Sequence, residues 1–221
     1  MSDIEFYWDP ICPFAWITSR WVSTVATRRD LSVDWRFISL RVLNEGRDYE
    51  TEFPPDYLDM HTRGQRMLRV AAAAREAHGR EVMGPLYAAL GESIWNRTRQ
   101  PGVRAFDGIG GESHLAMVLG QVGLPASLAA AADDDAFDTM LRADTATGLE
   151  RTGGGVGTPI VVLDPPDGPG FFGPVISRVP AANEAERLWD AVTLLAQWPG
   201  FAEIKRSLRE TPQLPLLAPR E

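Results

Sequence analysis

The chain has 221 residues, 44% of them hydrophobic and 24% charged. These values are typical of one large globular domain, or of one domain with an insertion, and they exclude a disordered, collagen-like or disulfide-rich chain. The balance of 22 basic and 30 acidic side chains, a formal net charge of −8, argues against nucleic acid and anionic membrane as partners, since both need a basic surface. The acidic start, the lack of an apolar leader and the single cysteine lead us to expect a cytoplasmic protein with no membrane span.

The first 40 residues predict a strand, a helix and a second strand. Residues 4–9 are rich in strand-forming side chains. From Pro13 onward the apolar side chains recur every four residues, which predicts a helix that ends near residues 28–29. Residues 33–37 alternate between apolar and polar, as a strand does. Such a unit is almost always parallel and right-handed.

The middle of the chain predicts only helices. We expect a polar loop over residues 43–56, helical spacing from Tyr57 to His78 and again from Leu86 to Ile94, and helices near residues 112–122, 126–132 and 135–150. About 100 residues therefore lack a strand signal. We interpret residues 43–152 as an all-helical insertion that separates the two parts of one domain, residues 1–42 and 153–221.

The last 70 residues predict two more strands and a closing helix. Three glycines end the helical block, and residues 160–163 form a short apolar run typical of a buried strand. A Pro/Gly turn leads to Phe171–Phe172, the start of a hairpin partner. An amphipathic helix is expected over residues 184–198 and a short one over residues 201–209. The order β-α-β, helical block, β-β-α predicts an α/β chain with a thioredoxin-like fold and a helical insertion.

Cys12 lies between Pro10 and Pro13, at the expected junction of the first strand and the first helix. The positive end of the helix macrodipole and the free N–H groups of the first turn favour a thiolate at such a position. A free cysteine near pKa 8.5 is only ~3% ionised at neutral pH, whereas helix N-termini lower the pKa to roughly 3.5–7.5. We therefore expect Cys12 to be an ionised nucleophile.

Thr158–Pro159 opens the third strand, where a proline is unusual because it cannot donate to the sheet. A cis bond would accommodate it. In a thioredoxin-like topology this proline faces the cysteine of the first helix. We therefore expect the backbone of Thr158 to pair with an extended thiol substrate.

Several segments resemble one family. Residues 9–16 (DPICPFAW), 156–159 (VGTP) and the helical insertion resemble the DsbA-like branch of the thioredoxin superfamily. Residues 16–21 (WITSRW), 43–48 (LNEGRD), 171–177 (FFGPVIS) and the segment from Leu188 to Arg206 are similar to the mycothiol-dependent nitroreductases (mycoredoxin-2-like) of actinobacteria. An actinobacterial source agrees with the composition, in which arginine far outnumbers the one lysine. The resemblance implies an oxidoreductase with mycothiol, or another low-molecular-weight thiol, as co-substrate and no tightly bound cofactor.

One departure from the family pattern matters. The best-known members carry Cys-Pro-Trp-Cys, but this chain reads Cys12-Pro13-Phe14-Ala15 and has no resolving cysteine. A mixed disulfide on Cys12 must then be cleaved by an external thiol. The sequence therefore predicts a monothiol thiol–disulfide oxidoreductase that acts on a disulfide or an electrophilic small molecule, with nitroreductase activity less secure than in dithiol members.

The resemblance also implies a substrate pocket beside Cys12 and Pro13. The family positions that match are Phe14, Asn44 and Tyr57, and they join Thr158 and Pro159 as expected binding residues. The histidine of a family His-Asn pair is replaced, since Trp95-Asn96 stands there. No metal-ligand spacing is present among the three histidines, so no metal site is expected.

Two alternatives stay open. The first is a relative of kappa-class glutathione transferases and 2-hydroxychromene-2-carboxylate isomerases, which place Ser where Cys12 stands and activate a bound thiol. The second is a non-catalytic binding module, which an ordinary pKa for Cys12 would favour. A monomer and a homodimer are both compatible with the sequence.

Overall fold

The computed structural model of the chain describes residues 2–99, 102–207 and 210–218. In this part of the chain one sheet forms with the strand order β2-β1-β3-β4. The strands are β1 (Ile4–Trp8), β2 (Val33–Phe37), β3 (Ile160–Leu163) and β4 (Gly170–Phe172). β1 runs parallel to β2 and antiparallel to β3, and β3 pairs antiparallel with β4. The predicted thioredoxin-like arrangement is confirmed.

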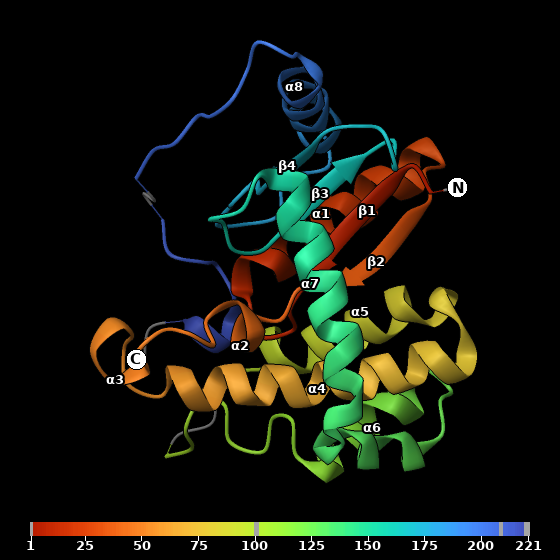
Figure 1. Ribbon diagram of the computed structural model, residues 1–221, viewed down its shortest axis with the longest axis vertical. Coiled ribbons are helices and arrows are strands. Elements are labelled where there is room, and N and C mark those ends of the chain that lie inside the picture. The colour runs from red at the N-terminus through yellow and green to blue at the C-terminus, as the bar shows by residue number, and fades with distance from the viewer. Residues whose placement is uncertain (1, 100–101, 208–209, 219–221) are drawn as a thin grey trace.

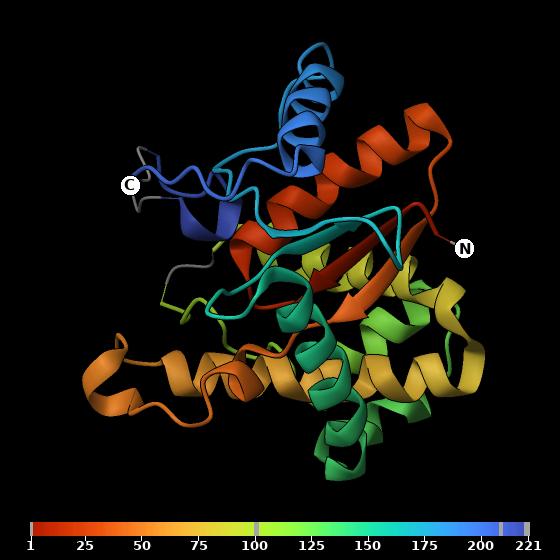
Figure 2. The same ribbon diagram turned by 45° about the horizontal axis from the view of Figure 1, so that its top comes forward.

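Helices α1 (Pro13–Arg29) and α8 (Ala185–Gln197) lie together on one side of the sheet (Figure 2). Pro13 occupies the first turn of α1, where its missing N–H is not needed, and the helix ends at Asp30 in the left-handed conformation, with φ 53°. The indole N–H of Trp21 donates to the carbonyl of Ala185 at 2.8 Å. This bond, with the edge-to-face packing of Trp21 on Trp189, attaches α8 to α1.

Between β2 and β3 the described chain is helical (Figure 1). The helices are α2 (Leu40–Leu43), α3 (Tyr49–Glu52), α4 (Tyr57–His78), α5 (Met83–Trp95), α6 (Glu112–Gln121) and α7 (Asp138–Thr152), with a 3-10 segment over Ala126–Asp133. The long helices agree with the prediction. The polar loop expected over residues 43–56 instead holds α3, whose N-cap Asp48 accepts from the N–H of Glu50. The division of the chain at residues 42 and 153 remains a prediction.

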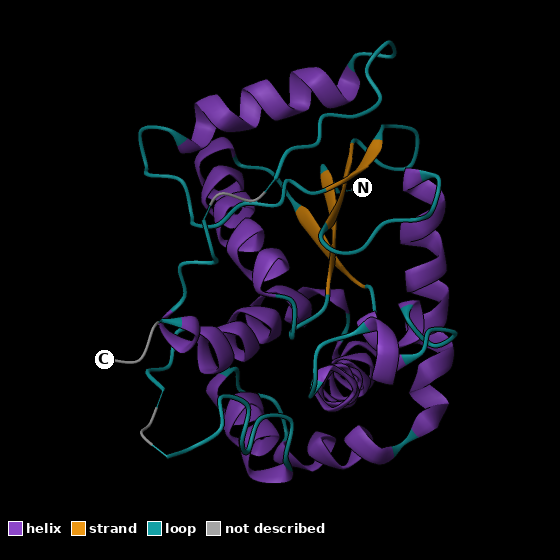
Figure 3. Ribbon diagram, turned by 90° about the vertical axis from the view of Figure 1, so that its left-hand side faces the viewer, coloured by secondary structure: helices purple, strands orange, loops and turns teal. Residues whose placement is uncertain are grey.

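The central strands β1 and β3 are buried on both faces, which explains why β1 alternates only weakly in polarity. Phe6 and Trp8 belong to the large core that includes α1, α4, α5 and α8. Tyr7 points to the other face, where it packs with Ile160 and Val162 beneath Leu149 of α7. Figure 1 shows α7 crossing this face, and Figure 3 shows the strands enclosed by helices.

The short helix expected over residues 201–209 is wrong for the part that the structure describes. Residues 201–207 have no regular structure, and nearly all of their side chains are exposed. Short helices are marginal in water without an apolar face to pack, which is the physical reason for the difference. Residues 208–209 lie outside the described residues. The chain then returns to the body, where Gln213 N–H donates to Ser177 O at 2.7 Å and Leu216 is buried.

Among the helices of the described residues, none combines the length and the apolar character that a membrane crossing requires.

Candidate functional site

Cys12 is the N-cap residue of α1. Its backbone is extended (φ −89°, ψ 113°), and its sulfur accepts a hydrogen bond from the N–H of Ala15 at 3.4 Å. The turn before it is closed by the Cys12 N–H, which donates to the carbonyl of Asp9 at 3.1 Å. The sulfur therefore lies at the position that the sequence predicts, at the positive end of a 17-residue helix.

The expected thiolate is contradicted in this conformation. Cys12 is only 6% exposed, and burial raises the pKa of its thiol to about 12, because an ionised sulfur would lose its water. The N–H of Ala15 lowers the pKa and the nearby carboxyl of Asp9 raises it further, but both effects are smaller than that of burial. At neutral pH the sulfur is a thiol.

The third strand meets Cys12 as expected. The Thr158–Pro159 peptide bond is cis, and the thiol of Cys12 lies 3.6 Å from the carbonyl oxygen of Thr158, to which it donates. The hydroxyl of Thr158 donates to the carbonyl of Tyr7 at 3.2 Å, and the carbonyl of Pro159 accepts from Gly173 at 2.8 Å. These bonds place the start of β3 directly beside the sulfur.

Asp9 organises the turn that carries Cys12, and the sequence analysis did not select it. Its carboxylate is fully buried; one oxygen accepts from the N–H of Ile11 at 2.9 Å and the other from the N–H of Leu40 at 2.8 Å. It therefore joins the site turn to the start of α2. Burial raises the pKa of Asp9 to about 7, against the effect of both N–H groups. A polar residue at the carboxyl end of a buried strand was the signal that could have identified it.

Helix α4 passes close to this carboxylate at Gly64. A Cβ at that position would lie 2.8 Å from Oδ1 of Asp9 and 3.2 Å from Cγ2 of Ile11. The missing side chain thus allows the middle of α4 to pack on the site turn.

Helix α5 supports the same turn from its C-terminal end. The indole N–H of Trp95 donates to the carbonyl of Pro10 at 2.9 Å, and the indole N–H of Trp16 donates to Oδ1 of Asn96 at 3.4 Å. Trp16 is otherwise buried in the core. The end of α5 thus contacts both sides of Cys12, at Pro10 and at Trp16.

The other expected binding residues come from three elements. Pro13 and Phe14 are partly buried in the first turn of α1. Asn44 follows α2 and is 8% exposed, and its side-chain amide donates to the carbonyl of Leu40 at 2.8 Å. Tyr57, at the start of α4, packs against the rings of Phe53 and His61. The structure brings Cys12 together with Thr158 and Pro159; a shared cleft for Phe14, Asn44 and Tyr57 remains a prediction.

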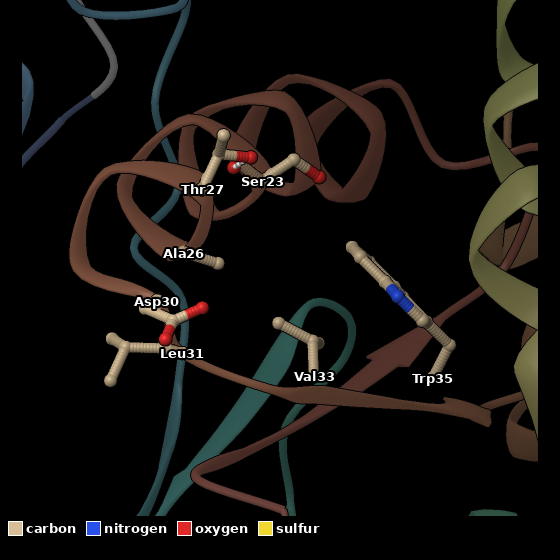
Figure 4. A pocket seen from close by; sticks show the side chains of 7 residues that line it. All are labelled: Ser23, Ala26, Thr27, Asp30, Leu31, Val33 and Trp35. Atoms are coloured by element: carbon tan, nitrogen blue, oxygen red, sulfur yellow. Dashed lines mark hydrogen bonds between the residues drawn. The ribbon is translucent and has the colours of Figure 1, made fainter.

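A hollow of about 410 Å³ lies at the opposite end of α1 (Figure 4). Figure 4 shows Ser23, Ala26 and Thr27 of α1 above Val33 and Trp35 of β2, with Asp30 and Leu31 closing one side. Cys12 does not line this hollow. Among the residues that the structure describes, no group of His, Cys, Asp and Glu side chains has the arrangement of a metal site.

Comparison with known proteins identifies the family. Residues 11–206 match the model of the Rv2466c-like family, described as mycothiol-dependent nitroreductase Rv2466c. The chain belongs to this family of oxidoreductases. It is also 32% identical to the uncharacterized protein Rv2286c of Mycobacterium tuberculosis, over 93% of this chain and 82% of that protein.

Solved structures share the fold. A 2-hydroxychromene-2-carboxylate isomerase matches with a TM-score of 0.52 and 18% identity, covering 87% of this chain and 95% of that one. The cytosolic disulfide reductase DsbM of Pseudomonas aeruginosa matches with a TM-score of 0.52 and 16% identity, over 87% and 99%. A second DsbM structure, with GSH, matches with a TM-score of 0.51 and 15% identity, over the same shares. At these identities the likeness concerns the fold: DsbA-like and thioredoxin-type, with a helical insertion.

Proposed function

We propose that this chain is a monothiol thiol–disulfide oxidoreductase that uses mycothiol as its co-substrate, with Cys12 as the nucleophile. The observation that supports it best is the position of the sulfur. It lies at the N-cap of α1, where it accepts from the N–H of Ala15 at 3.4 Å and lies 3.6 Å from the carbonyl of Thr158, which precedes a cis-proline. An extended substrate that pairs with Thr158 would present its own sulfur at this point.

The reaction begins with transfer of the Cys12 proton to water, which later returns a proton to the leaving thiolate. Because burial keeps the free thiol neutral, substrate binding must displace the bond between Cys12 and Thr158 and offer the ionised sulfur new partners. The N–H of Ala15 and the other first-turn groups of α1 then stabilise the thiolate. The thiolate attacks one sulfur of a disulfide, forms a mixed disulfide and releases the other half as a thiolate that takes a proton from water.

The second half of the cycle needs an external thiol. The chain has one cysteine, so mycothiol attacks the mixed disulfide and restores Cys12. We expect this cycle in a reducing, cytoplasmic compartment that supplies the thiol. Reduction of a nitro group to a nitroso group would pass through the same mixed disulfide but would consume two mycothiols, because the nitro compound contributes no sulfur. Cys12 and one mycothiol supply two electrons and two protons and become a mixed disulfide, water is released, and a second mycothiol frees the enzyme.

One observation favours a second candidate. The raised pKa of Cys12 fits a site that binds a thiol and activates it without covalent attack. A 2-hydroxychromene-2-carboxylate isomerase has the same fold and is an example of an enzyme of this second kind. In that case Cys12 would donate or accept a hydrogen bond to the bound thiol.

The two candidates differ in one measurable product. Intact mass spectrometry after incubation with one equivalent of mycothiol disulfide, glutathione disulfide or bacillithiol disulfide would detect the adduct on Cys12. We expect an adduct with mycothiol disulfide that disappears when mycothiol is added.

The matched variant is Cys12→Ser. It cannot form the adduct, but it keeps a hydrogen-bonding group for a bound thiol. The covalent cycle would be rejected if the wild type forms no adduct and Cys12→Ser still catalyses the mycothiol-dependent reaction. That result would support thiol activation. Loss of both adduct and turnover supports the proposal.

A further inference from the structure

Beside the Cys12 turn lies a cluster of polar and aromatic side chains that the proposed cycle does not use. It consists of Arg41 in α2, Tyr49 in α3 and His61 in α4. The hydroxyl of Tyr49 is 2.8 Å from Nδ1 of His61, and the Arg41 guanidinium lies 5.5 Å from the centre of the Tyr49 ring. Three separate elements therefore converge at this point.

The cluster adjoins the site through two contacts of Asp9. The first is the bond from the N–H of Leu40 to the Asp9 carboxylate at 2.8 Å, and Arg41 is the next residue along α2. The second is the approach of Gly64, where a Cβ would lie 2.8 Å from that carboxylate. His61 precedes Gly64 by three residues and so lies on the same face of α4. Figure 1 shows α2 beside the start of α1 and over α4.

Among the described residues, Arg41 is an arginine of this region without a carboxylate partner. Arg47 pairs with Glu52 at 2.7 Å, and Glu45 pairs with Arg142 at 2.6 Å. Within residues 2–99, 102–207 and 210–218, no carboxylate lies within ion-pair distance of Arg41. The nearby carboxyl of Asp9 already accepts two backbone N–H groups.

His61 is uncharged and does not add a second positive charge beside Arg41. It is 5% exposed, and burial, with a smaller effect of Arg41, lowers its pKa to about 4. The ring is therefore neutral at pH 7, and it fixes the hydroxyl of Tyr49 by the hydrogen bond at Nδ1. In the tautomer with the proton on Nδ1, His61 donates to Tyr49 and leaves the tyrosine O–H free to donate in turn. That hydroxyl and the Arg41 guanidinium near its ring then provide donors suited to a carboxylate.

We propose that Arg41, with Tyr49, binds a carboxylate of the substrate whose sulfur or electrophilic atom reacts at Cys12. The substrate class is thus an anionic disulfide or electrophile, and His61 is the residue that positions Tyr49. This inference rests on the proposed function, because it assigns the charged end of a substrate of that site.

Two probe disulfides test the inference, the dianionic 3,3′-dithiodipropionate and the neutral 2-hydroxyethyl disulfide. Intact mass spectrometry follows the rate of adduct formation on Cys12 with each disulfide. The measured quantity is the rate constant for the dianionic disulfide divided by that for the neutral one. In Arg41→Gln the ratio should fall roughly tenfold, the size expected for one charge-assisted hydrogen bond. Arg41→Lys should keep most of the ratio, since it keeps the cation.

Arg47→Gln is the matched control, because it removes a neighbouring arginine that is already paired and lies over the Phe53 ring at 4.5 Å. Its ratio should equal that of the wild type. A ratio in Arg41→Gln that equals the wild-type ratio would overturn the inference and leave the proposed function standing. Adducts with neither disulfide would overturn the proposed function as well.

Discussion

Gly64→Ala tests whether the close packing of α4 on the Asp9 carboxylate holds the site turn. The new Cβ would lie 2.8 Å from Oδ1 of Asp9, about 0.6 Å short of the 3.4 Å at which ordinary contact begins. Either α4 or the carboxylate must move. If the carboxylate moves, it loses the 2.9 Å hydrogen bond from the N–H of Ile11.

The magnitude follows from three effects. Alanine in a helix interior is favoured over glycine by about 1 kcal/mol. Overpacking of a well-packed interior costs about 1–3 kcal/mol, and a buried N–H left without a partner costs about 1–3 kcal/mol. We expect the free energy of unfolding to fall by about 1–5 kcal/mol, which lowers Tm by roughly 2–20 °C for a chain of this length.

Thermal unfolding measured by circular dichroism checks this result, with Gly120→Ala as the control. Gly120 lies in α6, and a Cβ there would meet nothing within 4 Å. The control should keep its stability or gain up to about 1 kcal/mol. The reasoning would be refuted by a Gly64→Ala protein that is as stable as Gly120→Ala and forms its Cys12 adduct at the wild-type rate.

Three further predictions concern the sulfur and the core. Because burial raises the pKa of Cys12 to about 12, its alkylation by iodoacetamide should keep rising from pH 7 to pH 10, and a plateau below pH 9 would contradict this. Arg75 and Asp144 form a 2.6 Å ion pair with side chains 8% and 11% exposed. Arg75→Met should therefore lower the free energy of unfolding, measured by chemical denaturation, by about 3–5 kcal/mol. Arg142→Met, which removes a pair exposed by 48% and 53%, should cost no more than about 1 kcal/mol. Ala15→Cys should convert a stable mixed disulfide into an internal one, since the Cys12 sulfur lies 3.4 Å from the backbone nitrogen of residue 15; a variant that keeps the adduct in mass spectrometry would contradict it.

Much of the fold was predictable because its signals are local. The four-residue spacing of Ile17, Trp21 and Val25 identified α1, and all three are buried. The alternation over residues 33–37 identified β2. The helix predicted over residues 201–209 failed over residues 201–207 because it depends on packing against the rest of the protein, which is not a local signal. Their apolar spacing resembles a helix, but no surface of the body packs against it, and local pattern contains no information about that.

The residues of the site also fall into those that local sequence signals predict and those that depend on packing. Cys12 and the Thr158–Pro159 bond were predictable, because a strand-to-helix junction and a proline at the start of a strand can both be recognised locally. The residues that hold the turn were not. Asp9 binds the N–H of a residue 31 positions later, and Trp95 donates to a carbonyl 85 positions earlier. Such pairs exist only after the helices have packed.

The pKa of Cys12 shows why a local argument about electrostatics gave the wrong sign. The helix N-terminus supplies one N–H to the sulfur at 3.4 Å, as expected. The helices and Thr158 that surround the turn remove the water that an isolated helix would leave in place, and burial then outweighs the hydrogen bond. The free site therefore offers a thiolate only the N–H groups of Ala15 and Phe14, whose effect on the pKa is smaller than that of burial. The remaining stabilisation has to arrive with the substrate, which displaces the Thr158 contact of the sulfur. A cation such as Arg41, which binds the far end of an anionic substrate, contributes to reactivity by holding that substrate where the exchange occurs.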